Sequence, residues 1–494
     1  MLLFWPVAIP FMTAVLTMLA WRSLRLQRAI SVTGGVLLLA SAIAIMAAVA
    51  ENGPVAAQAG GWPAPFGITM VADWLSAVMV LITGIMAVAT LVYGLADVTA
   101  AEERQGHHPL THGMLAGICG AFLTGDIFNM YVWFEVMLIA SFGLLVVGGG
   151  RAQLDGAVKY VGLNLIATLA FLAGVGLLYG ATGTLNMADL HGKLAGREGE
   201  TAILAAAMVL IFAFGSKAAV FPLFFWLPAS YHTPSFATSA LFSAMLTKVG
   251  VYALFRVFTL VFDSGAPGLQ PLLIWGSVAT MLVGVLGAAA QMNVRRILSF
   301  HIISQIGYMV LGLALWTPLG LLGGIFYVIH HIVVKANLFL IAGIMRGYTG
   351  SEELREIGGL WRHRPWLGVL FLIPAMSLAG MPPLSGFWAK LVILQAALEQ
   401  ERWIVAFFVL LVGLLTLFSM SKIWNEAFWK AHPGGEGALA PRTPLLALLP
   451  AVALAAITVA IGLYAAPFVD VAAAAAAGLL DPQAYLAAVL GATR

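Results

Sequence analysis

The chain has 494 residues, of which 62% are hydrophobic and only 9% are charged, and its mean hydropathy is +0.99. A soluble domain carries about 25% charged residues, so this composition excludes an ordinary soluble fold. The net charge of +3 comes from basic residues in short loops between apolar runs, which does not indicate a nucleic-acid-binding protein. The single cysteine, Cys119, excludes an internal disulfide.

Apolar runs recur almost without pause from Phe4 to Leu463. We count about fourteen runs of roughly 20 residues, which is the length of a helix that crosses a bilayer. The sequence therefore predicts an all-α polytopic membrane protein with no soluble domain between its spans. Arg22, Arg25 and Arg28 follow the first run rather than precede it, so this run is predicted to remain as an anchor and not to be a cleaved signal peptide.

The runs divide into four predicted parts. Residues 1–109 form an N-terminal three-helix segment, 110–260 a first five-helix repeat, 271–422 a second five-helix repeat, and 423–494 a C-terminal helix with an alanine-rich tail. Because five is an odd number, the second repeat enters the membrane upside down, so the two repeats are predicted to be inverted.

Each predicted repeat contains a span interrupted by proline. The first interruption is Phe221–Pro228, shortly after Lys217, and the second is Met381–Lys390, which follows Pro374. Proline removes a backbone donor and clashes with the preceding turn, so both helices are predicted to break. Paired broken helices in inverted repeats are typical of a transport site, although single prolines are also common as kinks in membrane helices.

Four lysines and one glutamate fall inside apolar runs. They are Glu135, Lys217, Lys248, Lys335 and Lys390. A charged side chain at the centre of a bilayer costs about 2.5 to 3.5 kcal/mol even on the mildest scale, so such residues usually serve ion or proton movement. The sequence predicts that these groups form a proton path through the membrane.

Arginine and lysine are concentrated in alternate loops. Examples are Arg22–Arg28, Arg295–Arg296 and Arg362–Arg364, whereas the other loops hold few basic residues. Because basic loops stay in the cytoplasm, both termini are predicted to lie outside it, in a multi-pass protein of the bacterial cell (inner) membrane.

In these motifs the chain resembles the antiporter-like membrane subunits shared by respiratory complex I and the Mrp-type multisubunit Na+/H+ antiporters. The resemblance covers about Leu110 to Trp424, and within it Arg295–Met309 and Phe224 are similar to the D-type subunits of Mrp antiporters. The motifs that carry it are Trp133–Glu135, Ser216–Lys217, Pro222–Pro228, Thr247–Gly250 and Pro382–Lys390.

The resemblance implies roles for the charges of the first half. Glu135 and Lys217 are expected to form an ion pair that switches the proton affinity of the lysine, with a purely structural salt bridge as the alternative. Lys248 is expected to connect the two halves, the alternative being a lysine that reaches the membrane surface. Arg256, near the outer end of the same span, is predicted to extend to that surface.

In the second half, His330, His331 and Lys335 lie on successive turns of one predicted span. His331 and Lys335 are four residues apart and share a helix face, which favours His331 as the relay but leaves His330 open. Lys390 is expected to end the proton path, with an interfacial anchor as the alternative. Two weaker candidates for a proton entry are His301 and Ser304.

The motifs predict no cofactor and no metal. No nucleotide-binding, haem or iron–sulfur signature is present in the sequence, and His107, His108 and His112 do not have the spacing of a standard metal site. The leading prediction is a proton-translocating subunit of a multisubunit monovalent cation (Na+)/H+ antiporter, a secondary transporter and not an enzyme. Its expected partners are the other subunits of the complex, H+, Na+ and the lipid membrane, with no nucleic acid. The alternative is a proton-pumping membrane subunit of an NADH:quinone oxidoreductase or a membrane-bound hydrogenase.

Overall fold

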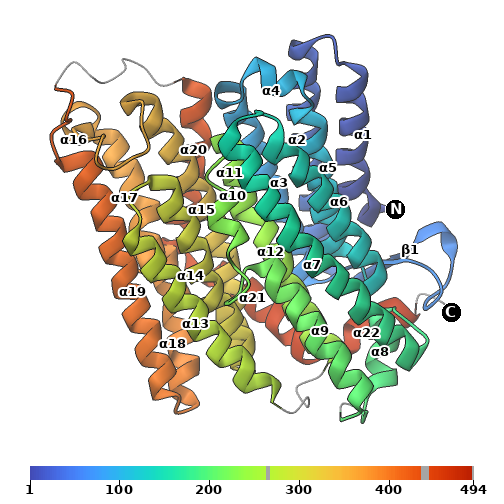
Figure 1. The fold of residues 1–494 in the computed structure, drawn as a ribbon. Coiled ribbons are helices and arrows are strands. Elements are labelled where there is room, and N and C mark those ends of the chain that lie inside the picture. The colour runs from blue at the N-terminus through green and yellow to red at the C-terminus, as the bar shows by residue number, and fades with distance from the viewer. Residues whose placement is uncertain (198, 263–267, 436–443, 492–494) are drawn as a thin grey trace.

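The computed structural model describes residues 1–494 apart from 198, 263–267, 436–443 and 492–494. It is a bundle of long helices that lie side by side (Figure 1). Within the described residues, 12 helices are long and apolar enough to cross a membrane, or 13 if the bent pair near the C-terminus forms one span. The polytopic helical class is therefore confirmed, whereas the count of fourteen and the inverted repeats stay predictions.

The N-terminal part pairs three membrane helices with a small β-hairpin. A 3-10 turn (Leu2–Phe4) leads into α1 (Trp5–Leu19). It is followed by α2 (Leu24–Asn52), β1 (Val55–Gln58), β2 (Thr69–Ala72), α3 (Trp74–Asp97) and the short α4 (Ala100–Arg104). The two strands are antiparallel, with Val55 opposite Ala72. Asp73 and Ser76 form a reciprocal capping box that fixes the start of α3.

The next part contains the first predicted repeat. Its elements are α5 (His107–Leu123), α6 (Ile127–Val146), α7 (Arg151–Thr182), α8 (Met187–Leu194), α9 (Thr201–Ala218), α10 (Trp226–Ser230), α11 (Phe236–Leu241), a π-helical turn (Phe242–Leu246) and α12 (Thr247–Leu260). Helix α9 stops before the predicted proline segment, at Ala219, whose φ of 63° is left-handed.

The remaining elements contain the second predicted repeat and the C-terminal part. They are α13 (Leu269–Ala290), α14 (Val294–Ala314), α15 (Pro318–Thr349), α16 (Leu360–His363), α17 (Pro365–Ala379), α18 (Ser385–Glu399), α19 (Trp403–Trp424), a π-helical turn (Asn425–Trp429), α20 (Leu445–Leu463), α21 (Ala465–Leu480) and α22 (Gln483–Gly491). Helix α17 stops at Gly380, with a φ of 93°, and the chain resumes as α18. The span is thus interrupted at the second predicted proline segment as well.

Burial separates central from peripheral helices. The apolar windows of α15 and of the continuous rod 236–260 are fully buried, and that of α14 is 94% buried. Those of α1, α2, α7 and α19 are only 39% buried, so these helices present apolar side chains outward. The centre of the bundle therefore lies between α12, α14 and α15, and the predicted site residues of the second half are on or next to these helices.

Candidate functional site

The charged residues of the apolar runs lie inside the bundle. Lys217 is 3% exposed, Lys248 and Lys335 are fully buried, and Glu135 and Lys390 are half-buried. None of the three buried lysines reaches a membrane surface, so the surface alternative for Lys248 is wrong. Each must find hydrogen-bond acceptors within the protein, because an unpaired charge in an apolar interior is costly.

Glu135 and Lys217 meet through a third residue. Thr168, on α7, donates its hydroxyl to Glu135 Oε1 at 2.7 Å and accepts from Lys217 Nζ at 2.9 Å. Lys217 also donates to the backbone oxygen of Asn164 at 3.2 Å. The expected ion pair is therefore a bridged one in the described structure, because the carboxylate on α6 and the ammonium on α9 both bond to one hydroxyl on α7.

An aromatic layer lies beside this bridge. Phe134, Phe171 and Phe214 come from the same three helices, and the Phe171 ring makes edge contacts with the other two at centroid distances of 5.6 and 4.8 Å. Phe171 and Phe214 each lie three residues from the bridge, toward the end of the bundle where α7 ends and α9 begins. Packed rings of this kind exclude water on that side of the bridge.

Lys248 is held by an irregularity in its own helix. Its Nζ donates to the backbone oxygen of Ser243, which lies in the π-helical turn Phe242–Leu246. A π turn shifts the backbone hydrogen-bond pattern and frees carbonyl groups, and such turns are frequent at functional sites. Gly250 allows α12 to approach α9 closely, since an added Cβ would lie 2.6 Å from Ala218 N. The turn of α12 that follows Lys248 is thereby brought next to the turn of α9 that carries Lys217.

Lys335 and His331 occupy the centre of α15. Lys335 Nζ donates to the backbone oxygen of Leu298 on α14 at 2.8 Å. His331 is fully buried, and within the described residues neither of its ring nitrogens has a hydrogen-bond partner. Lys248 and Lys335 both lie close enough to His331 for their charges to act on the ring. His331 therefore lies near both lysines; its helical spacing predicts the proximity to Lys335 but gives no signal for Lys248.

His330 faces a different group of residues. Its Nδ1 lies 2.9 Å from Ser385 Oγ at the start of α18, and Ser385 Oγ lies 2.8 Å from Ser377 Oγ at the end of α17. These two serines link the halves of the interrupted helix. His330 therefore points toward the second break, whereas His331 points toward the lysines, and both remain candidates for separate steps.

Lys390 turns back toward the break and not toward the membrane surface. Its Nζ donates to the backbone oxygens of Leu378 and Ala379 at 3.0 and 2.8 Å. These carbonyls are left free because α17 ends there, and the negative end of a helix dipole favours a cation. The ammonium also lies 5.2 Å from the centroid of the Tyr308 ring. The alternative role of Lys390 as an interfacial anchor does not agree with this geometry.

A cavity of about 270 Å³ opens beside Lys390. It is lined by both sides of the second break and by α19, including Gly380, Val409 and Gly413. Lys390 supplies the charged group in a lining that is otherwise largely apolar. The second break thus joins a half-buried ammonium to a largely apolar cavity.

The two weaker candidates are fully buried in α14. His301 Nε2 lies 2.9 Å from Ser419 Oγ on α19, and Ser304 Oγ accepts a long hydrogen bond from Gln305 at 3.4 Å. Gln305 in turn accepts from the hydroxyl of Tyr327. Their predicted role as a proton entry stays a prediction, because these contacts also fit hydrogen bonding between helices.

Arg256 does not extend to the membrane surface, so that prediction is wrong. It is 2% exposed, and its guanidinium pairs with Asp73 Oδ1 at 2.7 Å. The rings of Tyr252 and Tyr485 lie 5.5 and 5.2 Å from the guanidinium carbon. Asp73 is 183 positions from Arg256 in sequence, and a carboxylate that far away gave no local signal.

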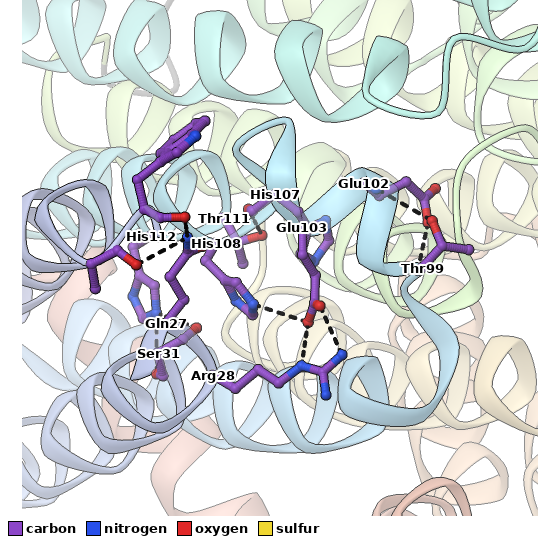
Figure 2. A network of polar contacts seen from close by, with 12 residues as sticks. Gln27, Arg28, Ser31, Thr99, Glu102, Glu103, His107, His108, Thr111 and His112 are labelled. Carbon is purple, nitrogen blue, oxygen red and sulfur yellow. Dashed lines mark hydrogen bonds and ion pairs between the residues drawn. The ribbon is translucent and has the colours of Figure 1, made fainter. Parts of the chain in front are cut away.

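Two of the three histidines near the start of α5, His108 and His112, make polar side-chain contacts with neighbouring helices. Figure 2 shows Glu103 between Arg28, which donates two hydrogen bonds of 2.7 Å, and His108, whose Nε2 is 3.2 Å from Glu103. His112 Nε2 lies 3.0 Å from Ser31 Oγ on α2. In the part of the chain that the structure describes, no group of three or more suitable ligands could hold a metal ion. The network joins α2, α4 and α5 at one end of the bundle.

Sequence reasoning missed the neutral members of the site. Thr168 lies in an apolar run with no nearby motif, and Tyr327 and Ser377 look like ordinary helix residues. Polar side chains inside spans are a general signal for helix contacts, but the partner of each is set by packing between helices.

Comparisons with known proteins agree with this architecture. A family model described as "NADH:quinone oxidoreductase/Mrp antiporter, TM" matches residues 124–416. A protein of Alkalihalophilus pseudofirmus, named as the D-type subunit of a Na(+)/H(+) antiporter, is 44% identical over 485 residues, which cover 98% of each chain.

Solved structures share the fold over nearly the whole chain. A chain in the structure of the Mrp complex from Dietzia sp. DQ12-45-1b aligns with a TM-score of 0.92 at 36% identity, covering 99% of both chains. A chain of respiratory complex I from Thermus thermophilus aligns with a TM-score of 0.83 at 26% identity, covering 97% of this chain and 100% of that one. The chain therefore belongs to the NADH:quinone oxidoreductase/Mrp antiporter family of membrane subunits.

Proposed function

We propose that this chain is the proton-translocating subunit of a multisubunit monovalent cation/proton antiporter, and that it exchanges Na+ for H+ together with its partner subunits. The relatives named as Na(+)/H(+) antiporter subunits support the transporter class, and the chain is a transporter component and not an enzyme. The observation that carries the proton role is the row of buried titratable groups that extends from Glu135 to Lys390 across the bundle.

The proposed path has three parts. Glu135, Thr168 and Lys217 form the first, on α6, α7 and α9. Lys248, His331 and Lys335 form the centre, where their charges act on one another. The third part consists of His330 and Lys390 at the second break, and His301 lies near enough to Lys335 and Lys390 to feel both charges.

The orientation and the repeats belong to the same proposal. The loops that contain Arg104, Arg295 and Arg362 face the cytoplasm of a bacterial cell, both termini lie outside it, and the chain crosses the inner membrane about fourteen times. The segments 110–260 and 271–422 act as inverted repeats, each interrupted once. The interruptions at Ala219 and Gly380 support that pairing.

Sodium crosses mainly elsewhere in the assembly. The central helices hold four lysines and one glutamate, and a row of ammonium groups repels a cation. A sodium site needs several oxygen ligands, usually carboxylates and freed carbonyls. In this chain, freed carbonyls at the second break and in the π turn are occupied by Lys390 and Lys248.

A pump subunit of an NADH:quinone oxidoreductase or a membrane-bound hydrogenase is the second candidate, favoured by the likeness to complex I. Partners that copurify with the chain separate the two. Small hydrophobic subunits without flavin or iron support the antiporter, and redox centres support the pump.

The test of the proposal is cation-dependent dissipation of ΔpH in vesicles that contain the whole complex. Glu135→Ala and Lys217→Ala are each expected to abolish most exchange while the complex still assembles. Normal exchange in either variant would contradict the proton path. Complete Na+/H+ exchange by this chain alone in liposomes would contradict the assignment of sodium to its partners.

A further inference from the structure

The threonine that bridges Glu135 and Lys217 makes unusual hydrogen bonds. A threonine in a helix normally donates its hydroxyl to the carbonyl four residues earlier. In this chain Thr83, Thr416 and Thr458 do so, at 2.7 to 2.9 Å. Thr168 instead donates to Glu135. The carbonyl that it would normally use, that of Asn164, accepts from Lys217.

As a result, the Thr168 hydroxyl lies between a carboxylate, that of Glu135, and an ammonium group, that of Lys217. Lys217 Nζ, Thr168 Oγ1 and Glu135 Oε1 are joined by hydrogen bonds of 2.9 and 2.7 Å. Thr168 is 7% exposed and Lys217 is 3% exposed, so bulk water has little access to the joint between them. In the described structure no ion-pair contact within 4.0 Å links the lysine to the glutamate directly.

We propose that Thr168 is a proton-relay residue, through which Lys217 and Glu135 exchange a proton without touching each other. This inference rests on the proton path proposed above and deepens it. When the proton moves, one N–H bond of the Lys217 ammonium breaks and an O–H bond forms at Thr168 Oγ1. The original O–H bond of Thr168 breaks at the same time, and an O–H bond forms at Glu135 Oε1. The result is a neutral amine, an intact hydroxyl and a neutral carboxylic acid.

The relay gives the ion pair a way to discharge without large side-chain movement. A fixed hydroxyl that both accepts and donates lets two charges neutralise each other by transfers over hydrogen-bond distances. Phe134, Phe171 and Phe214 keep their packing throughout, because none of the heavy atoms in the chain has to move far.

The experiment compares Thr168→Val with Thr168→Ser in the assembled complex. Valine has the shape of threonine but lacks the hydroxyl, whereas serine keeps it. We expect the maximal rate of exchange to fall about tenfold or more in Thr168→Val, with an unchanged apparent KM for Na+ and an altered pH profile. Thr168→Ser is expected to restore both the rate and the profile. Thr458→Val is the matched control, because it removes a buried hydroxyl that bonds only to its own helix.

A wild-type rate and pH profile in Thr168→Val would overturn the relay. If Thr168→Val does not assemble, Thr168→Cys replaces it, because a thiol is a weaker donor and acceptor of similar size. A rate between those of the serine variant and Glu135→Ala then supports the relay, and a wild-type rate overturns it. Glu135→Ala separates the two proposals: normal exchange in that variant rejects the proton path itself, whereas its loss together with a normal Thr168 variant rejects only the relay.

Discussion

At the scale of single residues, most of the lysine ammonium groups inside the bundle donate hydrogen bonds to backbone carbonyls and not to carboxylates. Lys248, Lys335 and Lys390 each donate to a carbonyl oxygen. A carbonyl satisfies a hydrogen bond but does not neutralise the charge, so these lysines differ from members of a structural salt bridge. Glu135 is the one carboxylate that the sequence places among them, and it reaches Lys217 only through Thr168.

The two adjacent histidines of α15 are expected to differ in what they contribute. His331→Leu removes two ring nitrogens that have no protein partner within the described residues, so the free energy of unfolding should stay the same or rise by about 1 kcal/mol. Exchange should nevertheless fall by about tenfold, because the group between Lys248 and Lys335 is lost. Thermal unfolding of the purified complex and ΔpH dissipation in vesicles measure the two effects.

His330→Leu is the matched comparison. It removes the hydrogen bond to Ser385, so it should lower the free energy of unfolding by about 1 kcal/mol. Equal stability losses in the two variants, or normal exchange in His331→Leu, would argue against the assigned position of His331 in the path.

At the scale of elements, the irregular segments create the hydrogen-bonding groups that the path uses. The π-helical turn before Lys248 and the end of α17 each free carbonyls for a lysine. At the first break, the carbonyl of Ser216 accepts from Ala219 N at 3.1 Å and from Trp226 Nε1 at 3.0 Å instead of from a lysine. The two breaks therefore have similar backbones but different partners.

Gly380→Ala tests the second break. Gly380 has a φ of 93°, and an added Cβ would lie 2.7 Å from Lys390 Cδ. The left-handed backbone should cost about 1 to 2 kcal/mol, and the methyl group should push the lysine away from the Ala379 carbonyl. We therefore expect lower stability together with a several-fold slower exchange.

Gly350→Ala provides the control for backbone strain alone. Gly350 has a φ of 75°, and no atom lies within 4 Å of the added Cβ. Similar stability losses with slower exchange only in Gly380→Ala are the expected pattern. Slower exchange in both variants would assign the effect to general destabilisation.

The start of α6 is predicted to make stability depend on pH. Asp126 Oδ1 accepts from Asn129 N at 2.7 Å as the N-cap, and burial raises the pKa of this carboxyl to about 6. The unfolded value is about 3.9, so between about pH 4 and 6 the folded chain binds more protons than the unfolded chain. Stability therefore falls as pH rises through this range, by about 1 to 3 kcal/mol, and the loss is complete above about pH 6.

Asp126→Asn keeps an amide oxygen for the cap and removes the titration. Its Tm relative to the unsubstituted chain should therefore increase between about pH 4 and pH 7, as measured by thermal unfolding of the complex in detergent. A difference that is constant over this range would mean that Asp126 does not titrate in the folded state there.

At the scale of the whole molecule, the proposed path is a series of steps. Lys217 lies at the first break and Lys390 at the second, with the central lysines between them. Steps in series are not independent, so the substitutions should not add. Lys217→Ala with Lys390→Ala is expected to reduce exchange to about the level of the slower single variant. A double variant whose loss equals the product of the single losses would mean that the two substitutions act independently, which would contradict steps in series.

The outer helices have another task. Helices α1, α2, α7 and α19 expose apolar residues such as Leu37, Leu169 and Phe418, which suits contact with lipid or with other membrane subunits. The polar network of Arg28, Glu103 and His108 fastens α2, α4 and α5 together at one end. This peripheral part is therefore stabilised by its own ion pair and hydrogen bonds, which do not belong to the proposed proton path.

The sequence by itself determined the membrane class, the positions of both interruptions and the charges to be buried. These follow from local composition, because long apolar runs must form helices in a bilayer and proline removes a backbone donor: Pro222, Pro382 and Pro383 lie between helices, although Pro374 stays inside α17. Only the tertiary structure decided which groups meet: Thr168 between Glu135 and Lys217, and Asp73 with Arg256. Those partners are 33 to 183 residues apart, and the packing of whole helices against one another, which no local pattern encodes, brings them within hydrogen-bonding distance.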